Sequence, residues 1–271
     1  MLHPGLYEQV SNNALTGELA GIPEARKAVA PIDKAEASKV LAQYLADVVQ
    51  KGLDNVLDNG GDVSTQIELT NRIIGLIQNM TKEADFAALG VDRRAEQLLA
   101  LLREADPRLA VGKTAADIER PETSIAQSSL FTGAIHEPQM FTELKKEIVS
   151  ADRIDMLVSF IKWSGLRLIM DELREFTHSG GELRIITTSY MGATDVKVIE
   201  ELRRLPNTQV KVSYNTKTTR LHAKAYIFYR ETGFTTAYVG SSNLSNAALT
   251  SGLEWNTKVT KRDLPETIDK I

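Results

Sequence analysis

The chain has 271 residues, 42% hydrophobic and 25% charged, a composition ordinary for a soluble globular protein and a length sufficient for two domains. It has no cysteine, which excludes disulfides, thiolate metal sites and a cysteine nucleophile, and fits a reducing compartment. The formal net charge of −4 argues against a protein that coats nucleic acid non-specifically, since such domains are usually basic.

Charge is divided unevenly along the chain. Acidic residues outnumber basic ones by six through Ser124, whereas basic residues lead by two from Ile125 onward. Two excess charges are too few to predict tight non-specific binding to nucleic acid. The N-terminus has no basic segment followed by an apolar stretch, and no run of about eighteen apolar residues occurs. We therefore expect a cytoplasmic protein without a membrane segment.

Residues 1–105 are patterned as helices. Apolar residues recur through residues 34–57 at the spacing of an amphipathic helix, and we expect that stripe to pack in a core. The Asn59-Gly-Gly sequence is a stop signal. A small all-helical domain is predicted, with oligomerisation and docking both open as roles. Two further helices are expected after residues that can cap them, from Asp62 or Ser64 through Met80 and from Asp92 through Glu104.

Residues 106–127 are weakly patterned and are predicted to be the interdomain linker. Gly112-Lys113-Thr114 resembles the end of a phosphate-binding loop. The glycine that such a loop requires five positions before Gly112 is Pro107, and no buried strand leads into it. We therefore expect no nucleotide site here.

Residues 128–271 alternate between helix and strand patterns. This alternation predicts an α/β fold, a mixed sheet with helices on both faces. The short segment 230–233 is expected to join two strands as a hairpin. Helices are expected at 143–150, 166–177, 195–205 and after Asn243, and strands at 154–161, 183–188, 209–214, up to Phe228, 235–240 and through Val259.

His222 and Lys224 are the most informative pair in the chain. They lie two residues apart among apolar residues, and alternation along a strand would send both side chains to one face. Gly240-Ser-Ser-Asn243 follows the next expected strand, where a turn into a helix presents backbone N–H groups to an anion. Glu254 comes eleven residues after Asn243 in another strand-like run.

These residue types suit phosphodiester cleavage. A neutral imidazole at His222 can attack phosphorus and split one displacement into two easier ones. Lys224, Ser241 and Asn243 can donate to phosphoryl oxygens whose charge grows in the transition state. Glu254 can accept the second ring N–H of His222 and fix its tautomer. None of these steps requires a metal or a cofactor.

A plainer interpretation of each residue also exists. His and Lys two apart in a strand are most often an exposed polar face, and a Glu in an alternating strand is usually solvated. The spacing of the three motifs together favours the active-site interpretation. Near expected strand ends, Lys162, Arg220 and Tyr190 are residues that can contact substrate or be ordinary surface, and Lys162 is taken as a substrate-binding candidate.

The motifs resemble those of the phospholipase D superfamily, particularly its single-motif nuclease branch. Residues 127–259 look like the nuclease-like module that precedes a DEAD/DEAH-type helicase in some bacterial proteins. The resemblance implies a phospholipase D-like mixed sheet, with His222 as nucleophile, Lys224, Ser241 and Asn243 as phosphate binders and Glu254 as the partner of His222. The fuller family signature has an Asp five residues after the Lys, where this chain has Tyr229.

The mechanism needs a second imidazole to protonate the leaving oxygen, and this chain has one candidate histidine. Single-motif relatives pair two subunits, so we expect a homodimer with a shared active site. The sequence thus predicts a metal-independent nuclease, acting on DNA rather than RNA, as a module of a helicase-containing DNA-processing or defence protein. The alternative is a non-catalytic module for nucleic-acid binding and dimerisation.

Overall fold

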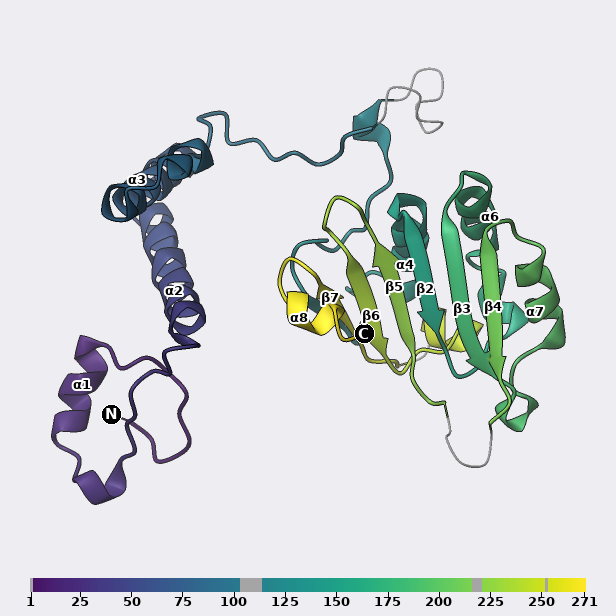
Figure 1. Ribbon diagram of the computed structural model, residues 1–271, viewed down its shortest axis with the longest axis horizontal. Coiled ribbons are helices and arrows are strands. Elements are labelled where there is room, and N and C mark those ends of the chain that lie inside the picture. Colours follow the sequence, from purple (N-terminus) through teal and green to yellow (C-terminus); the bar gives the residue numbers. More distant parts are fainter. Residues whose placement is uncertain (1, 103–113, 216–220, 252) are drawn as a thin grey trace. The chain divides into compact units, whose positions relative to one another are not determined.

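The computed structural model of the protein describes residues 2–102, 114–215, 221–251 and 253–271. The chain divides into two compact units, Met1–Leu98 and Leu99–Ile271 (Figure 1). Among the described residues, no helix has the length and apolar character needed to span a bilayer. The finer division into residues 1–105, 106–127 and 128–271 stays a prediction.

The N-terminal unit is helical, as predicted. Helix α3 begins after Asp62, whose carboxylate accepts a hydrogen bond from the Thr65 amide at 2.9 Å, so Asp62 rather than Ser64 is the cap. Gly60 adopts φ +82°, a left-handed conformation that ends the preceding helix. The elements are α1 (Asn13–Ala20), η1 (Glu24–Arg26), α2 (Ala37–Asp58), α3 (Val63–Thr81) and η2 (Ala84–Leu89).

The helix expected from Asp92 is wrong for the described residues. Residues 92–102 hold no helix, because the Asp92 carboxylate accepts the Arg94 amide in a tight turn and Ala95 adopts φ +55°. Leu98 and Leu101 are each 84% exposed. An apolar stripe stabilises a helix mainly when another surface covers it, and no described surface covers this one.

The core packing expected for the α2 stripe is also wrong. Helices α1, α2 and α3 contain no buried residue. Leu41, Leu45 and Val48 of α2 are 45–48% exposed. The stripe is therefore only half covered within the described part of this unit.

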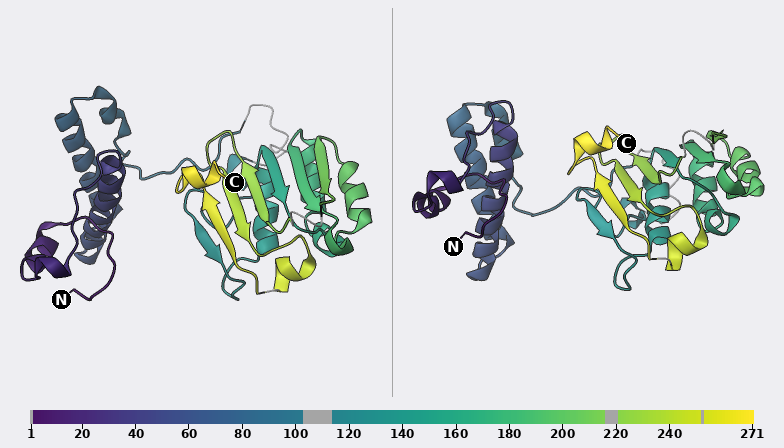
Figure 2. Two further views of the ribbon diagram at one scale, coloured as in Figure 1. Left: turned by 60° about the horizontal axis from the view of Figure 1, so that its bottom comes forward. Right: turned by 90° about the horizontal axis from the view of Figure 1, so that it is seen from below.

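The C-terminal unit is built on one mixed sheet, as predicted, with a seventh strand, β1, that the sequence analysis did not expect (Figures 1 and 2). Strands β2, β3 and β4 run parallel to one another, and the remaining neighbours pair antiparallel. The spatial order is β1-β7-β6-β5-β2-β3-β4. The strands are β1 (Ser129–Phe131), β2 (Arg153–Leu157), β3 (Glu182–Thr188), β4 (Thr208–Ser213), β5 (Ala225–Tyr229), β6 (Thr236–Gly240) and β7 (Asn256–Thr260).

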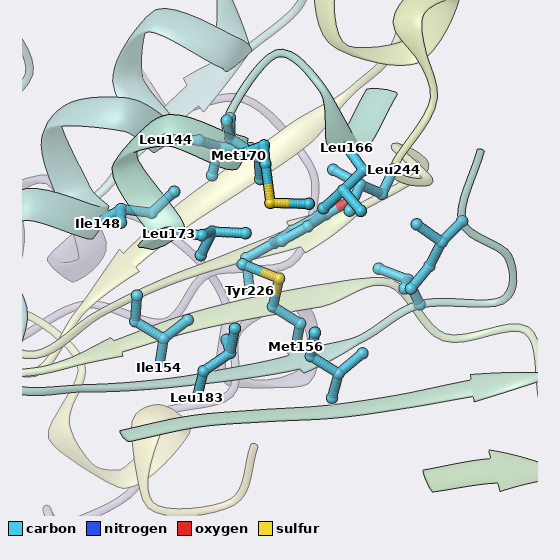
Figure 3. Packing of buried hydrophobic residues seen from close by; sticks show 14 of the residues in the cluster. Leu144, Ile148, Ile154, Met156, Leu166, Met170, Leu173, Leu183, Tyr226 and Leu244 are labelled. Carbon is cyan, nitrogen blue, oxygen red and sulfur yellow. The ribbon is translucent and has the colours of Figure 1, made fainter. Parts of the chain in front are cut away.

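Helices cover the two faces of the sheet unequally. The larger core lies between one face and the helices α4, α6 and α7, where Tyr226, Leu173 and Met156 pack together (Figure 3). On the opposite face, Ile268 of α8 packs on Ile227 and its neighbours. The helical elements are η3 (Ala115–Asp117), α4 (Met140–Ser150), α5 (Trp163–Leu166), α6 (Met170–His178), η4 (Tyr190–Gly192), α7 (Val196–Arg203), η5 (Ala247–Ser251) and α8 (Pro265–Ile268).

Two predicted elements are shorter than expected. Strand β2 ends at Leu157 rather than at residue 161, because the chain bends and Ile161 forms an isolated bridge to Leu244. The helix expected at 166–177 is divided into α5 and α6, with Ile169 at φ −123° between them. Apolar character continues through both breaks, so hydrophobic pattern alone does not show them.

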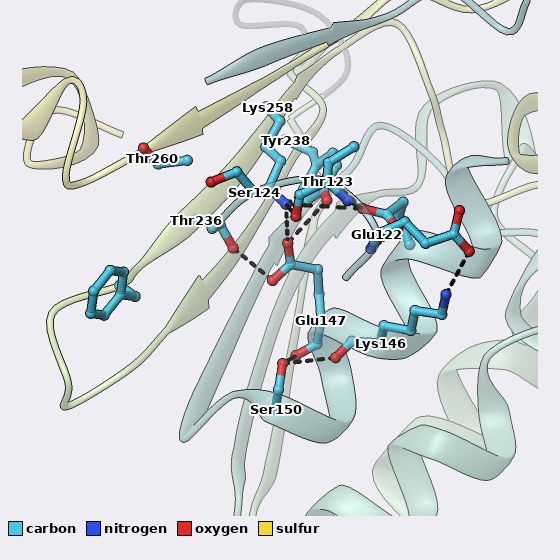
Figure 4. A network of polar contacts seen from close by, with 12 residues as sticks. Glu122, Thr123, Ser124, Lys146, Glu147, Ser150, Thr236, Tyr238, Lys258 and Thr260 are labelled. Carbon is cyan, nitrogen blue, oxygen red and sulfur yellow. Dashed lines mark hydrogen bonds and ion pairs between the residues drawn. The ribbon is translucent and has the colours of Figure 1, made fainter. Parts of the chain in front are cut away.

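The buried carboxylate of Glu147 on α4 joins the helix to β6 and β7 (Figure 4), and also to Arg230, which follows β5. It pairs with Arg230 at 2.6 Å and with Lys258 at 2.9 Å, and it accepts hydrogen bonds from the hydroxyls of Thr236 and Tyr238 at 2.8 and 3.0 Å. Both Glu147 and Lys258 are fully buried. Buried charges persist only when paired and hydrogen-bonded, and every partner here is supplied by the fold.

The neighbouring Glu143 binds the segment that precedes the sheet. Its carboxylate accepts the amides of Glu122 and Thr123 at 2.7 and 3.3 Å, and Lys258 donates to the Thr123 hydroxyl at 2.9 Å. The Thr260 hydroxyl donates to the Ala126 carbonyl at 3.0 Å. Part of the segment that the sequence assigns to the linker thus packs on α4 and β7.

The pKa of Glu147 reflects this pairing. Burial raises the pKa, but the charges and hydrogen bonds of Arg230 and Lys258 outweigh burial and hold the pKa below its ordinary value of 4.5. The contribution of this carboxylate to stability is therefore complete above pH 4.5 and is lost as the pH falls through the lower, folded-state pKa.

Replacing Glu147 with Gln is expected to lower the free energy of unfolding by about 3–5 kcal/mol at pH 7, because two buried cations lose their counter-charge. Urea denaturation at pH 7 and at several pH values below 4.5 measures this, and the gap between wild type and variant should narrow in acid. Glu201→Gln, which removes an exposed pair with Arg204, is the control, with an expected loss below about 0.5 kcal/mol. Equal urea midpoints for wild type and Glu147→Gln at pH 7 contradict the prediction.

Candidate active site

Four strand ends meet at one end of the C-terminal sheet. Ala225 at the start of β5 pairs with Leu157 at the end of β2 and with Val239 near the end of β6. Gly240, the last residue of β6, pairs with Asn256, the first of β7. The residues just beyond these ends are therefore brought together, and the predicted site residues 222, 224, 241, 243 and 254 are among them.

His222 and Lys224 precede β5 rather than lying within it, so the prediction that a strand carries both is wrong. Their side chains nevertheless meet. The Nζ atom of Lys224 lies 3.2 Å from both ring nitrogens of His222 and donates to the His222 carbonyl at 2.9 Å. His222 is exposed, whereas Lys224 is buried. Since an ammonium group can only donate, its contact with the ring requires a nitrogen with a free lone pair.

Gly240 and Ser241 connect β5, β6 and β7. The Gly240 amide donates to the Lys224 carbonyl at 3.2 Å, and the Ser241 amide donates to the Trp255 carbonyl at 3.1 Å. The Ser241 hydroxyl accepts the Trp255 amide at 3.1 Å and donates to the Trp255 carbonyl at 3.3 Å, a bond that it must give up to donate to a phosphoryl oxygen. A Cβ atom on Gly240 would lie 2.2 Å from the Trp255 carbonyl oxygen, so this close approach of two backbones requires glycine.

Asn243 is held by Phe160, which follows the bend after β2. Its Oδ1 accepts the Phe160 amide at 3.2 Å, and the next residue, Leu244, accepts the Lys162 amide at 2.9 Å. With Oδ1 occupied, the NH₂ group of Asn243 is the part of the side chain that can donate to a phosphoryl oxygen.

Glu254 lies just before β7 and is half-buried. Burial and then the charge of Glu254 raise the pKa of Tyr226, which places the carboxylate near that buried hydroxyl. Among the described residues, Glu254 and His222 form no hydrogen bond, so the predicted role of Glu254 as partner of the ring stays a prediction.

Lys162 is already paired. Its ammonium donates to the Asp195 carboxylate at 3.1 Å, and the Trp163 amide donates to the same carboxylate at 2.8 Å. These two donors hold the pKa of Asp195 below its ordinary value. Lys162 is thus positioned beside the Asn243 segment by its backbone, with a charge that Asp195 balances. Arg220 and the Gly112-Lys113 pair lie outside the described residues.

Ser159 is a residue that the sequence reasoning did not assign to the site. It directly precedes Phe160, is 7% exposed, and its hydroxyl has no hydrogen-bond partner among the described residues. A polar group left unpaired in the interior costs about 1–3 kcal/mol. The sequence gives no signal for Ser159, because the contact of its neighbour Phe160 with Asn243 joins residues 83 positions apart. Within the described part of the chain, no cluster of three or more His, Asp or Glu residues is placed to hold a metal ion.

Comparisons with known proteins agree with this architecture. Residues 144–271, a little under half of the chain, match the family described as cardiolipin synthase, PLD-like domain. A comparison with curated protein sequences gives no match. The C-terminal unit thus has a PLD-like fold, a mixed sheet with flanking helices, and residues 144–271 are similar to that family.

Solved structures similar to the chain include a phospholipase D family member and a kinase. NucT from Helicobacter pylori has 23% identity over 53% of this chain and 89% of its own, with a TM-score of 0.41. Nuc from Salmonella typhimurium, a phospholipase D family member, has 21% identity over the same shares, with a TM-score of 0.39. Polyphosphate kinase from Porphyromonas gingivalis has 11% identity over 53% of this chain and 25% of its own, with a TM-score of 0.38.

Replacing Gly240 with Ala is expected to destabilise the C-terminal unit by about 1–3 kcal/mol, because the added methyl group meets the backbone of Trp255 and Asn256. Thermal unfolding followed by circular dichroism measures the loss. Gly75→Ala in α3, where nothing lies within 4 Å of the added carbon, is the matched control and should not destabilise its helix. A Gly240→Ala protein with unchanged unfolding shows that β6 and β7 can separate at this point.

Proposed function

We propose that the C-terminal unit is a metal-independent phosphodiesterase that cleaves nucleic acid through a covalent phosphohistidine at His222. One observation carries the proposal: the contacting pair His222 and Lys224 lies at the end of the sheet that also carries Ser241 and Asn243. A nucleophile, a cation and neutral donors are the groups that phosphoryl transfer through nitrogen requires.

The first step forms the phosphohistidine. The lone pair of a His222 ring nitrogen attacks phosphorus, a P–N bond forms, and the P–O bond to the leaving oxygen breaks with its electron pair. The leaving oxygen takes a proton from a general acid. Lys224, Ser241 and Asn243 donate to the remaining phosphoryl oxygens as their charge grows.

The second step restores the enzyme. The general acid, now a base, takes a proton from water, which attacks phosphorus as the P–N bond breaks. Glu254 is assigned the remaining ring N–H of His222, a role that needs a local movement, since the two groups do not bond in this structure.

The general acid is assigned to His222 of a second copy of the chain. The sequence has four histidines, and none of the others is followed two residues later by Lys. His178, for example, lies in the last turn of α6, where its Nδ1 contacts the Arg174 carbonyl at 2.8 Å. A two-fold axis through one phosphate site brings two copies of the same residue together.

The proposed substrate is nucleic acid, DNA in preference to RNA. The resemblance of residues 127–259 to helicase-linked nuclease modules supports DNA, and it supports a place for the chain in a larger helicase-containing protein for DNA processing or defence. The slight excess of basic residues after Ser124 is compatible with a phosphate-bearing substrate.

The second candidate function is a non-catalytic module for nucleic-acid binding and dimerisation. The described contacts include no hydrogen bond between Glu254 and the His222 ring, which favours it, because a ring without an acidic partner is a weaker nucleophile and base. Both candidates use the same phosphate-binding groups, so only a test of bond cleavage separates them.

Wild-type protein in excess EDTA is expected to cut labelled DNA, whereas His222→Ala should not cut and Lys224→Ala should cut about 10²–10³-fold more slowly. Gel analysis of the labelled products measures both rates. His178→Ala is the control and should cut normally, since its ring contacts only its own helix in the described contacts. Binding without cutting by the wild type supports the non-catalytic module, and cutting that EDTA stops rules out the metal-independent mechanism.

Mixing wild-type and His222→Ala chains tests the shared site. If each site needs His222 from both copies, only dimers of two wild-type chains act. After subunit exchange, an equal mixture should then have about one quarter of the activity of the same total amount of protein that is all wild type. Light scattering should report a dimer for both proteins. Retention of one half indicates that each chain acts by itself.

A further inference from the structure

Trp255 lies next to the candidate site with its side chain 64% exposed. The preceding residue is Glu254, and its backbone is bonded on both sides to Ser241: its amide donates to the Ser241 hydroxyl at 3.1 Å and its carbonyl accepts the Ser241 amide at 3.1 Å. These bonds extend the β6–β7 pairing of Gly240 with Asn256 by one residue. The backbone position of Trp255 is thus set by a residue predicted to bind phosphate.

Strand alternation places the tryptophan ring on a particular face. Asn256 and Lys258 are buried on the face that α4 covers, where Lys258 meets Glu147. Trp255 therefore turns to the opposite face, together with Val239 and Leu130, which both pair with Thr257. Val239 is 38% exposed and Leu130 is 49% exposed. We call Trp255, Val239 and Leu130 the rim patch.

The side chains of the rim patch are exposed, whereas the neighbouring apolar side chains on the same face of the sheet are covered by α8. Ile268 of α8 packs on Ile227, Ala237 and Val259. Ala237 and Val259 lie two residues further from the site than Val239 and Thr257, in the same strands. Exposed apolar side chains of an ordinary surface are scattered singly, whereas these three gather around Thr257 beside the site. Trp255 offers the one large aromatic ring among them.

We propose that Trp255 is a stacking platform for an unpaired nucleobase next to the scissile phosphate. The inference deepens the proposed function and depends on it. The backbones of Lys224 and Trp255 lie about two strand spacings apart, roughly 10 Å, so the sugar and base attached to a phosphate bound at Lys224 would reach over the ends of β6 and β7. A base in a duplex has both faces stacked on its neighbours and offers none to the ring. The substrate is therefore single-stranded or locally unpaired nucleic acid.

The energetics of stacking give the expected effect. Removing an aromatic platform weakens binding of a single strand by roughly 5- to 150-fold, the equivalent of about 1–3 kcal/mol per base. Trp255→Phe keeps a ring and should retain most of the affinity, whereas Trp255→Leu keeps only apolar area and should not. Because the side chain is mostly exposed, the Phe and Leu variants and Trp255→Ala are all expected to fold.

Tryptophan fluorescence provides the test, because the chain has only two tryptophans, Trp163 and Trp255. Trp163 is packed beside the core, with Lys197 Nζ 4.1 Å from its ring centre. All binding measurements use the full chain with His222→Ala, so that nothing is cut. The probes are an oligothymidylate, an abasic strand of the same length and a duplex.

The oligothymidylate is expected to quench fluorescence strongly and the other two probes weakly, and the quenching should disappear in Trp255→Ala but persist in Trp163→Phe. Trp255→Ala should lose affinity for the oligothymidylate and keep its affinity for the abasic strand. Equal binding of the oligothymidylate by Trp255→Ala overturns the proposal. So does a change from dimer to monomer in Trp255→Ala by light scattering, because the ring then belongs to a subunit interface.

Failure of the proposed function gives a different result. A wild type that neither cuts nor binds any nucleic acid overturns both the function and the platform. A wild type that cuts single strand and duplex at equal rates, with Trp255→Ala cutting as fast, keeps the phosphodiesterase and overturns the platform alone.

Discussion

The carboxylate of Glu147 is bonded at once to β6, to β7 and to the residue that follows β5. Arg230 follows β5, Thr236 and Tyr238 belong to β6, and Lys258 belongs to β7. A buried carboxylate tolerates little displacement, because each lost partner leaves a charge or a hydroxyl unpaired in the interior. The alignment of these strands is therefore fixed from inside the molecule, well away from their ends.

That alignment determines the candidate site. Lys224, Ser241 and Glu254 lie one or two residues beyond β5, β6 and β7, and their relative positions follow from the pairing of Ala225 with Val239 and of Gly240 with Asn256. A slip of one residue in any of these strands would turn its side chains to the other face. Precision at the site is thus obtained from packing in the core and from the tight approach at Gly240, without long-range contacts between the site residues themselves.

Lys224 contacts the His222 ring in this structure and a phosphoryl oxygen in the proposed mechanism. The Lys224 ammonium contacts the His222 ring, so a lone pair needed for attack is engaged. A phosphodiester brings oxygens that carry charge, and hydrogen bonds between charged partners are stronger than those to a neutral ring nitrogen. In the proposed mechanism the ammonium would therefore move from the ring to the phosphate, leaving a ring lone pair of His222 available for attack.

The sequence could predict the parts of this site that depend on contacts between segments close together in the chain, and not the parts that depend on distant segments. The motif spacing indicated that His222, Lys224, Ser241 and Asn243 converge, because strand pairing brings hairpin-connected ends together. It could not show that β5 begins only at Ala225, since Leu221 and Ala223 alternate with His222 and Lys224 in a pattern that a strand would also have. Nor could it show the bond from Phe160 to Asn243, which joins residues 83 positions apart. Ser159 was missed for the same reason.

The two units differ in what periodicity alone can establish. In the C-terminal unit, the face of the sheet that packs on the helices is covered, since Tyr226 and Leu173 meet between the sheet and α6. In the N-terminal unit, the α2 stripe has the same helical period, yet Leu41 and Leu45 remain nearly half exposed, and the helix expected after Asp92 does not form. Period identifies which face is apolar, whereas burial depends on a second surface that the pattern does not encode. The chemistry proposed for the chain therefore depends on the unit whose core is complete.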